Sequence, residues 1–227
     1  MSQTRIVYTK EHWDLLAQKR ARAKDLLELF YKEGLKPHAF GSIARGDINP
    51  RSDIDIVFFQ TIPTFKIEYI LEVNKERIMS KEITQATPGD AIKASIFLSE
   101  LECLTIPLTS FKGNSVQFYG FTGSIDLTQI LNDVRLPGIN KQLLIIIPEE
   151  EGHNELELHS NEAFAAKLLN IDLDFIHQRI RILTKREKIG RTGVFLHERL
   201  RPDENFEKVL KDIGNKNSYV RKILMDN

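Results

Sequence analysis

The stretch that decides the fold covers residues 40–59 and reads FGSIARGDINPRSDIDIVFF. Its second half is an apolar run that two acids, Asp53 and Asp55, interrupt. Successive side chains of a strand point to opposite faces, so Asp53 and Asp55 share one face while Ile54 and Ile56 share the other. Two carboxylates this close repel each other, and each favours water or a cation. The pattern therefore predicts a positive charge beside this strand.

The first half of the same stretch predicts a turn that binds phosphate. Gly41 and Ser42 follow a short apolar strand and precede IARGD, which can begin a helix. A glycine lets a ligand approach the backbone closely, and a serine hydroxyl and free amides at a helix N-terminus bind phosphate oxygens. The Walker type of phosphate loop is excluded, because no Lys-Ser or Lys-Thr follows the glycine at the required spacing. Carboxylate oxygens suit Mg²⁺, so the stretch predicts a site for a nucleotide and a metal ion.

Together, Gly-Ser at 41–42, Ala-Arg-Gly at 44–46 and SDIDIV at 52–57 resemble the signature of the DNA polymerase beta-like nucleotidyltransferase superfamily. That group includes CCA-adding enzymes and minimal nucleotidyltransferases. The resemblance implies an α/β (α+β) fold with a mixed sheet flanked by helices. It also implies an enzyme that transfers a nucleoside monophosphate from an NTP, such as ATP, to a hydroxyl acceptor.

The same resemblance implies roles for individual residues. Asp53 and Asp55 would be catalytic and would hold one or two Mg²⁺ ions, with Mn²⁺ as a substitute. The nucleotide-binding residues would be Gly41, Ser42, Arg45 and Ser52.

Members of this family use a third carboxylate, on a neighbouring strand, as a metal ligand and proton acceptor. Glu102, which alternates with Leu104 and Ile106 in LECLTIPL, is the first candidate for this metal-binding and catalytic role. Asp126 in GSIDL is the alternative third ligand. If neither reaches the metal, the site binds a nucleotide without turning it over. The chain would then be a nucleic-acid-binding regulator that uses a nucleotidyltransferase fold as a nucleotide sensor or scaffold.

Composition bounds the remaining possibilities. The 227 residues are 41% hydrophobic and 28% charged, enough for a packed core in one large or two modest domains. Lys plus Arg and Asp plus Glu both number 32, so bulk charge does not indicate a polyanionic partner. A single cysteine, Cys103, excludes an internal disulfide and a cysteine-built zinc site. The N-terminal residues lack the apolar core of a signal peptide, and no stretch is long enough to span a bilayer. We therefore expect a cytoplasmic protein without a membrane partner.

The resemblance implies a nucleotidyltransferase domain over residues 1–150, and local patterns predict its elements. Apolar spacings of three and four predict a helix over residues 10–32, although Arg20 interrupts the apolar series. Further helices are expected over residues 65–80 and, after a cap at Asp90, over residues 91–100. Strands are expected at residues 81–87, 101–111, 115–127 and 141–150.

Residues 151–227 predict a small, mainly helical, winged-helix-like domain. SNEAFAAKLLN and DLDFIHQRIRILTKRE resemble a helix-turn-helix, with Asn170 at the turn, Asp172 as a cap and KIGRTGVFLHERL as a wing. Residues 175–201 hold eight Lys or Arg against two Glu, a local excess typical of phosphate-backbone binding. RNA or DNA is therefore a candidate partner; the alternative is a helical pair that packs on the catalytic domain. The candidate nucleic-acid-binding residues are Arg181, Lys185, Lys188 and Arg191.

Overall fold

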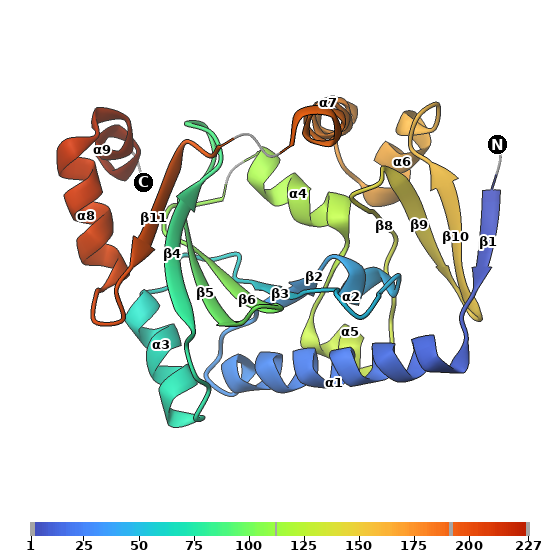
Figure 1. The fold of residues 1–227 in the computed structure, drawn as a ribbon, viewed down its shortest axis with the longest axis horizontal. Helices are drawn as coiled ribbons and strands as arrows, with labels where there is room; N and C mark the ends of the chain where they lie inside the picture. Colours follow the sequence, from blue (N-terminus) through green and yellow to red (C-terminus); the bar gives the residue numbers. More distant parts are fainter. Residues whose placement is uncertain (1–2, 112, 191–192, 226–227) are drawn as a thin grey trace.

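The computed structural model describes residues 3–111, 113–190 and 193–225, which form a seven-stranded and a four-stranded sheet with helices around them (Figure 1). The larger sheet has the strand order β11-β4-β5-β6-β3-β2-β7, and the smaller has the order β1-β10-β9-β8. Both sheets are joined through helices that alternate with the strands along the chain. The predicted mixed α/β class is therefore confirmed.

The strands are β1 (Gln3–Val7), β2 (His38–Phe40), β3 (Ile54–Val57), β4 (Ser80–Gln85), β5 (Lys93–Ser99), β6 (Glu102–Pro107), β7 (Ser124–Ile125), β8 (Gly138–Ile139), β9 (Leu144–Glu149), β10 (Gly152–Glu157) and β11 (Leu196–Leu200). The helices are α1 (Lys10–Tyr31), α2 (Ser42–Arg45), α3 (Thr64–Val73), α4 (Asn114–Thr122), α5 (Leu127–Leu131), α6 (Glu162–Leu169), α7 (Leu173–Ile189), α8 (Phe206–Lys216) and α9 (Ser218–Met225).

The strand that carries the acidic pair lies inside the larger sheet. β3 runs antiparallel to β2 and parallel to β6. Its apolar side chains, Ile54 and Ile56, are buried in one core with Leu27 and Phe30 of α1, which runs beneath the sheet in Figure 1. The opposite face of β3, which carries Asp55, lies under α4 (Figure 1). The predicted alternation of β3 is therefore the feature that separates a dry face from a polar one.

Helix α1 matches its predicted bounds closely, and Arg20 lies within its buried stripe. The Arg20 guanidinium donates to the backbone carbonyls of Ile43 (3.1 Å), Ala44 (3.4 Å) and Val134 (2.6 Å). These carbonyls belong to α2 and to the segment after α5. The buried charge is thus satisfied by backbone oxygens, and it fixes α2 against α1.

Two of the predicted elements are wrong in type. Residues 91–100, expected as a helix, contain β5, in which Ala94 and Ile96 are buried and Lys93 and Ser95 are only half-buried. This period of two is that of a strand, and β5 pairs on both sides, with β4 and β6. Residues 115–127, expected as a strand, instead form most of α4 and then the short β7.

The chain does not divide at residue 150, where a domain boundary was predicted. That position falls in the hairpin between β9 and β10, and β10 pairs with β1 at the other end of the chain. β11, predicted as a wing, pairs antiparallel with β4 and forms the edge of the larger sheet. The stretch after residue 150 therefore contributes a strand to each sheet, and the winged-helix-like prediction is wrong.

The predicted helical pair corresponds to α6 and α7. Asn170 adopts the left-handed conformation between them, with φ 52° and ψ 50°, as the sequence predicts. Ala165 of α6 and Ile176 of α7 are buried in a second core with Phe121 of α4 and Ile145 of β9. The pair therefore packs on the rest of the chain. Among the described residues, every helix is too short or too polar to cross a lipid bilayer.

Gly152 lies where β1 and β10 approach each other most closely. A Cβ atom at this position would lie 1.9 Å from the carbonyl oxygen of Ile6. We expect Gly152→Ala to displace β1 and to lower the free energy of unfolding by about 1–3 kcal/mol, measured by urea denaturation. Gly89→Ala is the control, because a Cβ there meets nothing within 4 Å. Equal stability of the two variants would contradict this account of β1.

Candidate active site

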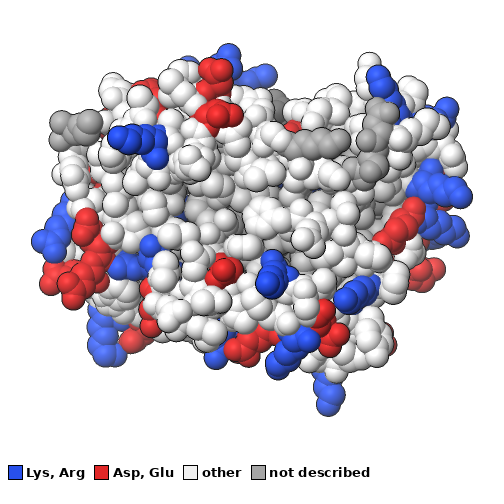
Figure 2. Space-filling view, turned by 180° about the vertical axis from the view of Figure 1, so that it is seen from behind, with Lys and Arg blue, Asp and Glu red and all other residues white. Residues whose placement is uncertain are grey.

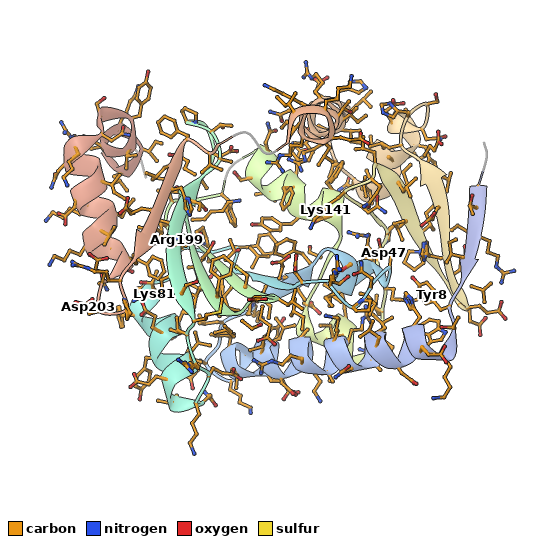
Figure 3. All side chains as sticks on the ribbon, in the orientation of Figure 1. Tyr8, Asp47, Lys81, Lys141, Arg199 and Asp203 are labelled. Carbon is orange, nitrogen blue, oxygen red and sulfur yellow. The ribbon has the colours of Figure 1, made fainter. Side chains whose placement is uncertain are left out.

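The acidic pair lies at the start of β3, on the face turned away from α1. Asp55 is half-buried, with Phe40 of β2 opposite it on one side and Cys103 of β6 on the other. Asp53 immediately precedes the strand, and its side chain is 43% exposed. The nearest cation among the described residues is Lys141, whose Nζ lies 3.9 Å from Asp53 Oδ2. Lys141 comes from the turn between β8 and β9 (Figure 3).

The electrostatics of Asp55 favour an added positive charge. Burial, and then the neighbouring charge of Asp53, raise the pKa of Asp55 to about 6, and Lys141 opposes this only in part. The ionised pair is therefore under-compensated in the protein alone. A cation placed between the two carboxylates would remove the repulsion.

The predicted phosphate-binding turn lies beside the acidic pair. Phe40 pairs antiparallel with Asp55, so the residues that follow Phe40 lie next to the start of β3. Gly41 adopts φ 80° and ψ −141° and begins α2, and a Cβ at Gly41 would meet nothing within 4 Å. Ser42 is half-buried in the first turn of α2. The structure thus brings together Gly41, Ser42, Asp53 and Asp55.

Arg45 does not point toward this site. Its side chain is only 6% exposed and forms a bidentate ion pair with Asp47, with distances of 2.9 and 3.0 Å. Its third contact is the carbonyl oxygen of Thr122 at the end of α4, 2.7 Å away. Because all three contacts are internal, the structure contradicts the prediction that Arg45 binds the nucleotide. Arg45 instead joins α2 to the end of α4.

Ser52 is buried and closes the loop that precedes the acidic pair. Its hydroxyl accepts from the Asn49 backbone N–H (2.9 Å), and its own N–H donates to the Asn49 carbonyl (2.9 Å). The Ser52 carbonyl accepts from Lys19 Nζ at 2.7 Å. These contacts position Asp53, so Ser52 supports the site rather than contacting a ligand.

Glu102 lies on the wrong face of the sheet to be the third ligand. In the parallel pair of β3 and β6, Glu102 is opposite Ile54, whose side chain is in the core beside α1. Its carboxylate accepts from Arg22 of α1 at 2.8 and 3.2 Å, and Arg22 also pairs with Glu76. Asp55 points to the other face. The prediction that Glu102 completes a metal site is therefore wrong.

The alternative third ligand, Asp126, is also committed elsewhere. It is the N-cap of α5, where its side chain accepts from the Gln129 backbone N–H at 2.8 Å. The Gln129 side chain accepts in turn from the Asp126 N–H at 3.0 Å, which completes a capping box. A carboxylate that stabilises a helix N-terminus in this way does not serve the acidic pair.

The residue beside Asp55 on β6 is Cys103. Burial, and next the charge of Asp55, raise the pKa of the Cys103 thiol to about 12, so the thiol is neutral. The described residues contain no group of three His, Cys, Asp or Glu side chains that could hold a metal ion. Two carboxylates fit a single Mg²⁺ ion whose other ligands are phosphate oxygens and water. Neither Lys141 nor Cys103 was singled out by the motifs in the sequence.

Three of the four predicted nucleic-acid-binding residues lie on α7. Arg181, Lys185 and Lys188 are exposed and make no ion pair with the described part of the chain, whereas Arg191 is outside the described residues. On the face that Figure 2 shows, which is the back of the view in Figure 1, basic and acidic side chains are mixed around a largely uncharged centre. Such mixed signs are typical of an ordinary solvated surface.

Comparison with known families gives one match, over part of the chain. Residues 20–104 match the family model of the nucleotidyltransferase domain. The nucleotidyltransferase match begins within α1 and ends within β6, so it contains the turn at Gly41, the acidic pair and Cys103. Asp126, Lys141 and α7 lie outside it. Searches of curated proteins and of solved structures found no match to the chain.

The ion pair between Glu102 and Arg22 predicts the effect of a substitution at Glu102. Glu102→Gln should lower the free energy of unfolding by about 1 kcal/mol, because Arg22 then keeps only Glu76 as a charged partner. Divalent-dependent NTP binding, measured by calorimetry, should be unchanged. Glu100→Gln, at an exposed neighbouring position, is the control for charge. Loss of NTP binding at unchanged stability would show instead that Glu102 is a ligand.

A second prediction concerns the pH dependence of the metal-free protein. The pKa of Asp55 is raised to about 6 in the folded protein, so the folded state binds the Asp55 proton more tightly than the unfolded state does. The stability that this proton contributes is fully present below about pH 4 and is lost as the pH rises through about 6. Asp55→Asn should therefore raise the free energy of unfolding by about 1–3 kcal/mol at pH 7 and leave it unchanged at pH 4. Urea denaturation in EDTA across this range measures the difference. An Asp55→Asn variant that is less stable than the wild type at pH 7 would contradict the repulsion inferred between Asp53 and Asp55.

Proposed function

We propose that this chain is a Mg²⁺-dependent nucleotidyltransferase that transfers a nucleoside monophosphate from an NTP to a hydroxyl acceptor. The observation that carries the proposal is the acidic pair beside the Gly41 turn, within the span that matches the nucleotidyltransferase domain. In this reaction the acceptor oxygen bonds to the α-phosphorus, and the bond from that phosphorus to the pyrophosphate oxygen breaks. The hydroxyl proton leaves to a base or to solvent.

Asp53 and Asp55 would hold the ion, and Mn²⁺ would be accepted by the same oxygen ligands. A bound ion neutralises charge on the phosphates and lowers the pKa of the attacking hydroxyl. The chain supplies two carboxylates whose spacing is fixed by the buried Ile54 and Ile56 on the other face of β3. Because that spacing is set before the nucleotide arrives, no reorganisation of the carboxylates is needed on binding.

The turn would receive the phosphates. The positive φ of Gly41 exposes the backbone at the start of α2, and no side chain covers it. The Ser42 hydroxyl and the first amides of α2 are the donors on that side. Lys141 would be an exposed counter-charge, since its side chain is 82% exposed and its Nζ lies 3.9 Å from Asp53 Oδ2.

A second candidate function is a nucleotide-dependent regulator that binds an NTP and does not transfer it. The observation that favours it is Cys103, which places a neutral thiol beside Asp55. The nucleotide and ion would still bind at the acidic pair, while proton removal from an acceptor would lack a third carboxylate. In either case we propose a nucleic acid, RNA or DNA, as the partner, supported by the exposed cations Arg181, Lys185 and Lys188.

Removing the acidic pair tests Mg²⁺-dependent NTP binding, which the transferase and the regulator would share. Asp53→Asn with Asp55→Asn should abolish Mg²⁺-dependent NTP binding, measured by calorimetry with each NTP, and should leave the fold intact. Asp203→Asn with Asp212→Asn removes the same charge from exposed positions and should bind NTP normally. Asp203 lies far from Lys141, the residue that pairs with Asp53 (Figure 3). Unchanged NTP binding by the first variant would refute the proposed site.

Turnover separates the two functions. The wild-type protein is incubated with each labelled NTP, Mg²⁺ or Mn²⁺, and RNA, DNA or protein acceptors, and the products are resolved by gel. Label transferred to an acceptor, with release of pyrophosphate, supports the transferase. NTP binding without transfer to any of these acceptors supports the regulator.

A further inference from the structure

Two basic side chains converge on the aromatic rings of α4. Lys93 of β5 lies over Phe118, with its Nζ 6.0 Å from the ring centroid, and Arg179 of α7 lies 5.2 Å from the same ring. Lys93 also contacts the ring of Tyr119 at 5.8 Å, and Arg179 contacts Phe121 at 5.7 Å. Both side chains are half-buried, so each charge is partly removed from water.

Neither cation has an ion-pair partner in the part of the chain that the structure describes, although the charge of Asp90 acts on both. No ion pair within 4.0 Å involves Lys93 or Arg179, and the Nε of Arg179 is buried without a hydrogen-bond partner. The nearby acid is Asp90, whose Oδ2 already accepts from the backbone and hydroxyl of Thr87 at 3.0 and 2.7 Å. Burial lowers the pKa of both cations.

A third cation extends this group. Arg186 lies seven residues after Arg179 on α7, two helical turns along the same side, and its charge further lowers the pKa of Arg179. Three cations near one acid form a site with excess positive charge. Since buried charges are normally paired, an anion is the missing partner of this cluster.

The cluster faces the same side of the larger sheet as the acidic pair. Cys103 and Pro107 lie an even number of residues apart on β6, so their side chains share one face of the sheet. Cys103 pairs with Asp55 of β3, and Pro107 pairs with Lys93 of β5. From strand spacing and rise, the Cα atom of Lys93 is roughly 16 Å from that of Asp55. Lys93 therefore starts well beyond the acidic pair along the sheet, a position that suits phosphates of a second molecule whose end lies at Asp55.

We infer that Lys93 and Arg179 bind backbone phosphates of a single-stranded nucleic acid whose terminal hydroxyl is the acceptor. This inference rests on the proposed function, and it adds Lys93 and Arg179 to the exposed cations of α7 as contacts for the strand. The aromatic rings keep the two cations extended, so little side-chain freedom is lost when phosphates bind.

The test replaces both cations with apolar side chains that still cover the rings, Lys93→Met with Arg179→Met. Binding of a short, fluorescein-labelled single-stranded RNA or DNA is measured by anisotropy over a series of NaCl concentrations. We expect affinity to fall at least about tenfold, and the salt dependence to become less steep by about 1.4, since two phosphate contacts are lost. Mg²⁺–NTP binding, measured by calorimetry, should be unchanged.

Two controls make the result decisive. Lys208→Gln with Lys211→Gln removes the same charge from exposed positions on α8 and should bind the strand normally. Lys93→Arg with Arg179→Lys keeps both charges and should retain most of the binding. This conservative variant also decides the question if the methionine variant fails to fold, since its loss of strand binding in a folded protein would contradict the inference.

The remaining outcomes separate this inference from the proposed function. Unchanged strand affinity and salt dependence in the methionine variant would overturn the inference. Loss of NTP binding in place of strand binding would show that the cations hold the triphosphate, which also overturns it. The acidic-pair variant should keep its strand affinity, so failure of NTP binding in the wild type would refute the proposed function without affecting the strand assay.

Discussion

Asp53 and Asp55 are held close enough to repel each other because the buried face of β3 prevents this strand from rotating. Ile54 and Ile56 are buried in the core against α1, and side chains of a strand alternate between its faces. A slip of one residue would bury the carboxylates and expose the isoleucines, so the apolar core fixes the register. The fold therefore holds the two charges together at a cost that a divalent cation can offset. The rest of the site is arranged around this one strand.

Three arginines of α1 and α2 serve the scaffold. Arg20 donates to three backbone carbonyls, Arg45 pairs with Asp47, and Arg22 joins α1 to β6 through Glu102. Each is surrounded by internal acceptors, and none is free to meet a phosphate. The cations that lack internal partners, such as Lys93, lie farther along the same face of the sheet. In this chain, the absence of a partner marks a candidate ligand-binding cation better than its place in a motif.

Patterns confined to one element were predictable from the sequence. The alternation in residues 53–57 and the stripe of α1 set the strand, the helix and the face that carries the acids. Pairings between distant segments were not, because β1 with β10 and β11 with β4 join segments that lie far apart along the chain. The local patterns in residues 91–100 and 115–127 were misinterpreted: the first is a strand flanked by partners on both sides, and the second is a helix that covers the acidic face.

The face of β6 that lies beside Asp55 was predictable from the sequence, because side chains alternate between the two faces of a strand. Glu102, Leu104 and Ile106 share a face of β6, and that face is the core, so Cys103 is the residue that meets Asp55. A carboxylate there would raise the pKa of Asp55 further, whereas a neutral thiol leaves the site with two negative charges to balance one divalent cation. The thiol accepts no proton from an acceptor hydroxyl at neutral pH. In the proposed function, binding of a nucleotide and its transfer would therefore be separable: the acidic pair and the Gly41 turn would serve the first, and the second would need a proton acceptor from solvent or from the bound phosphates.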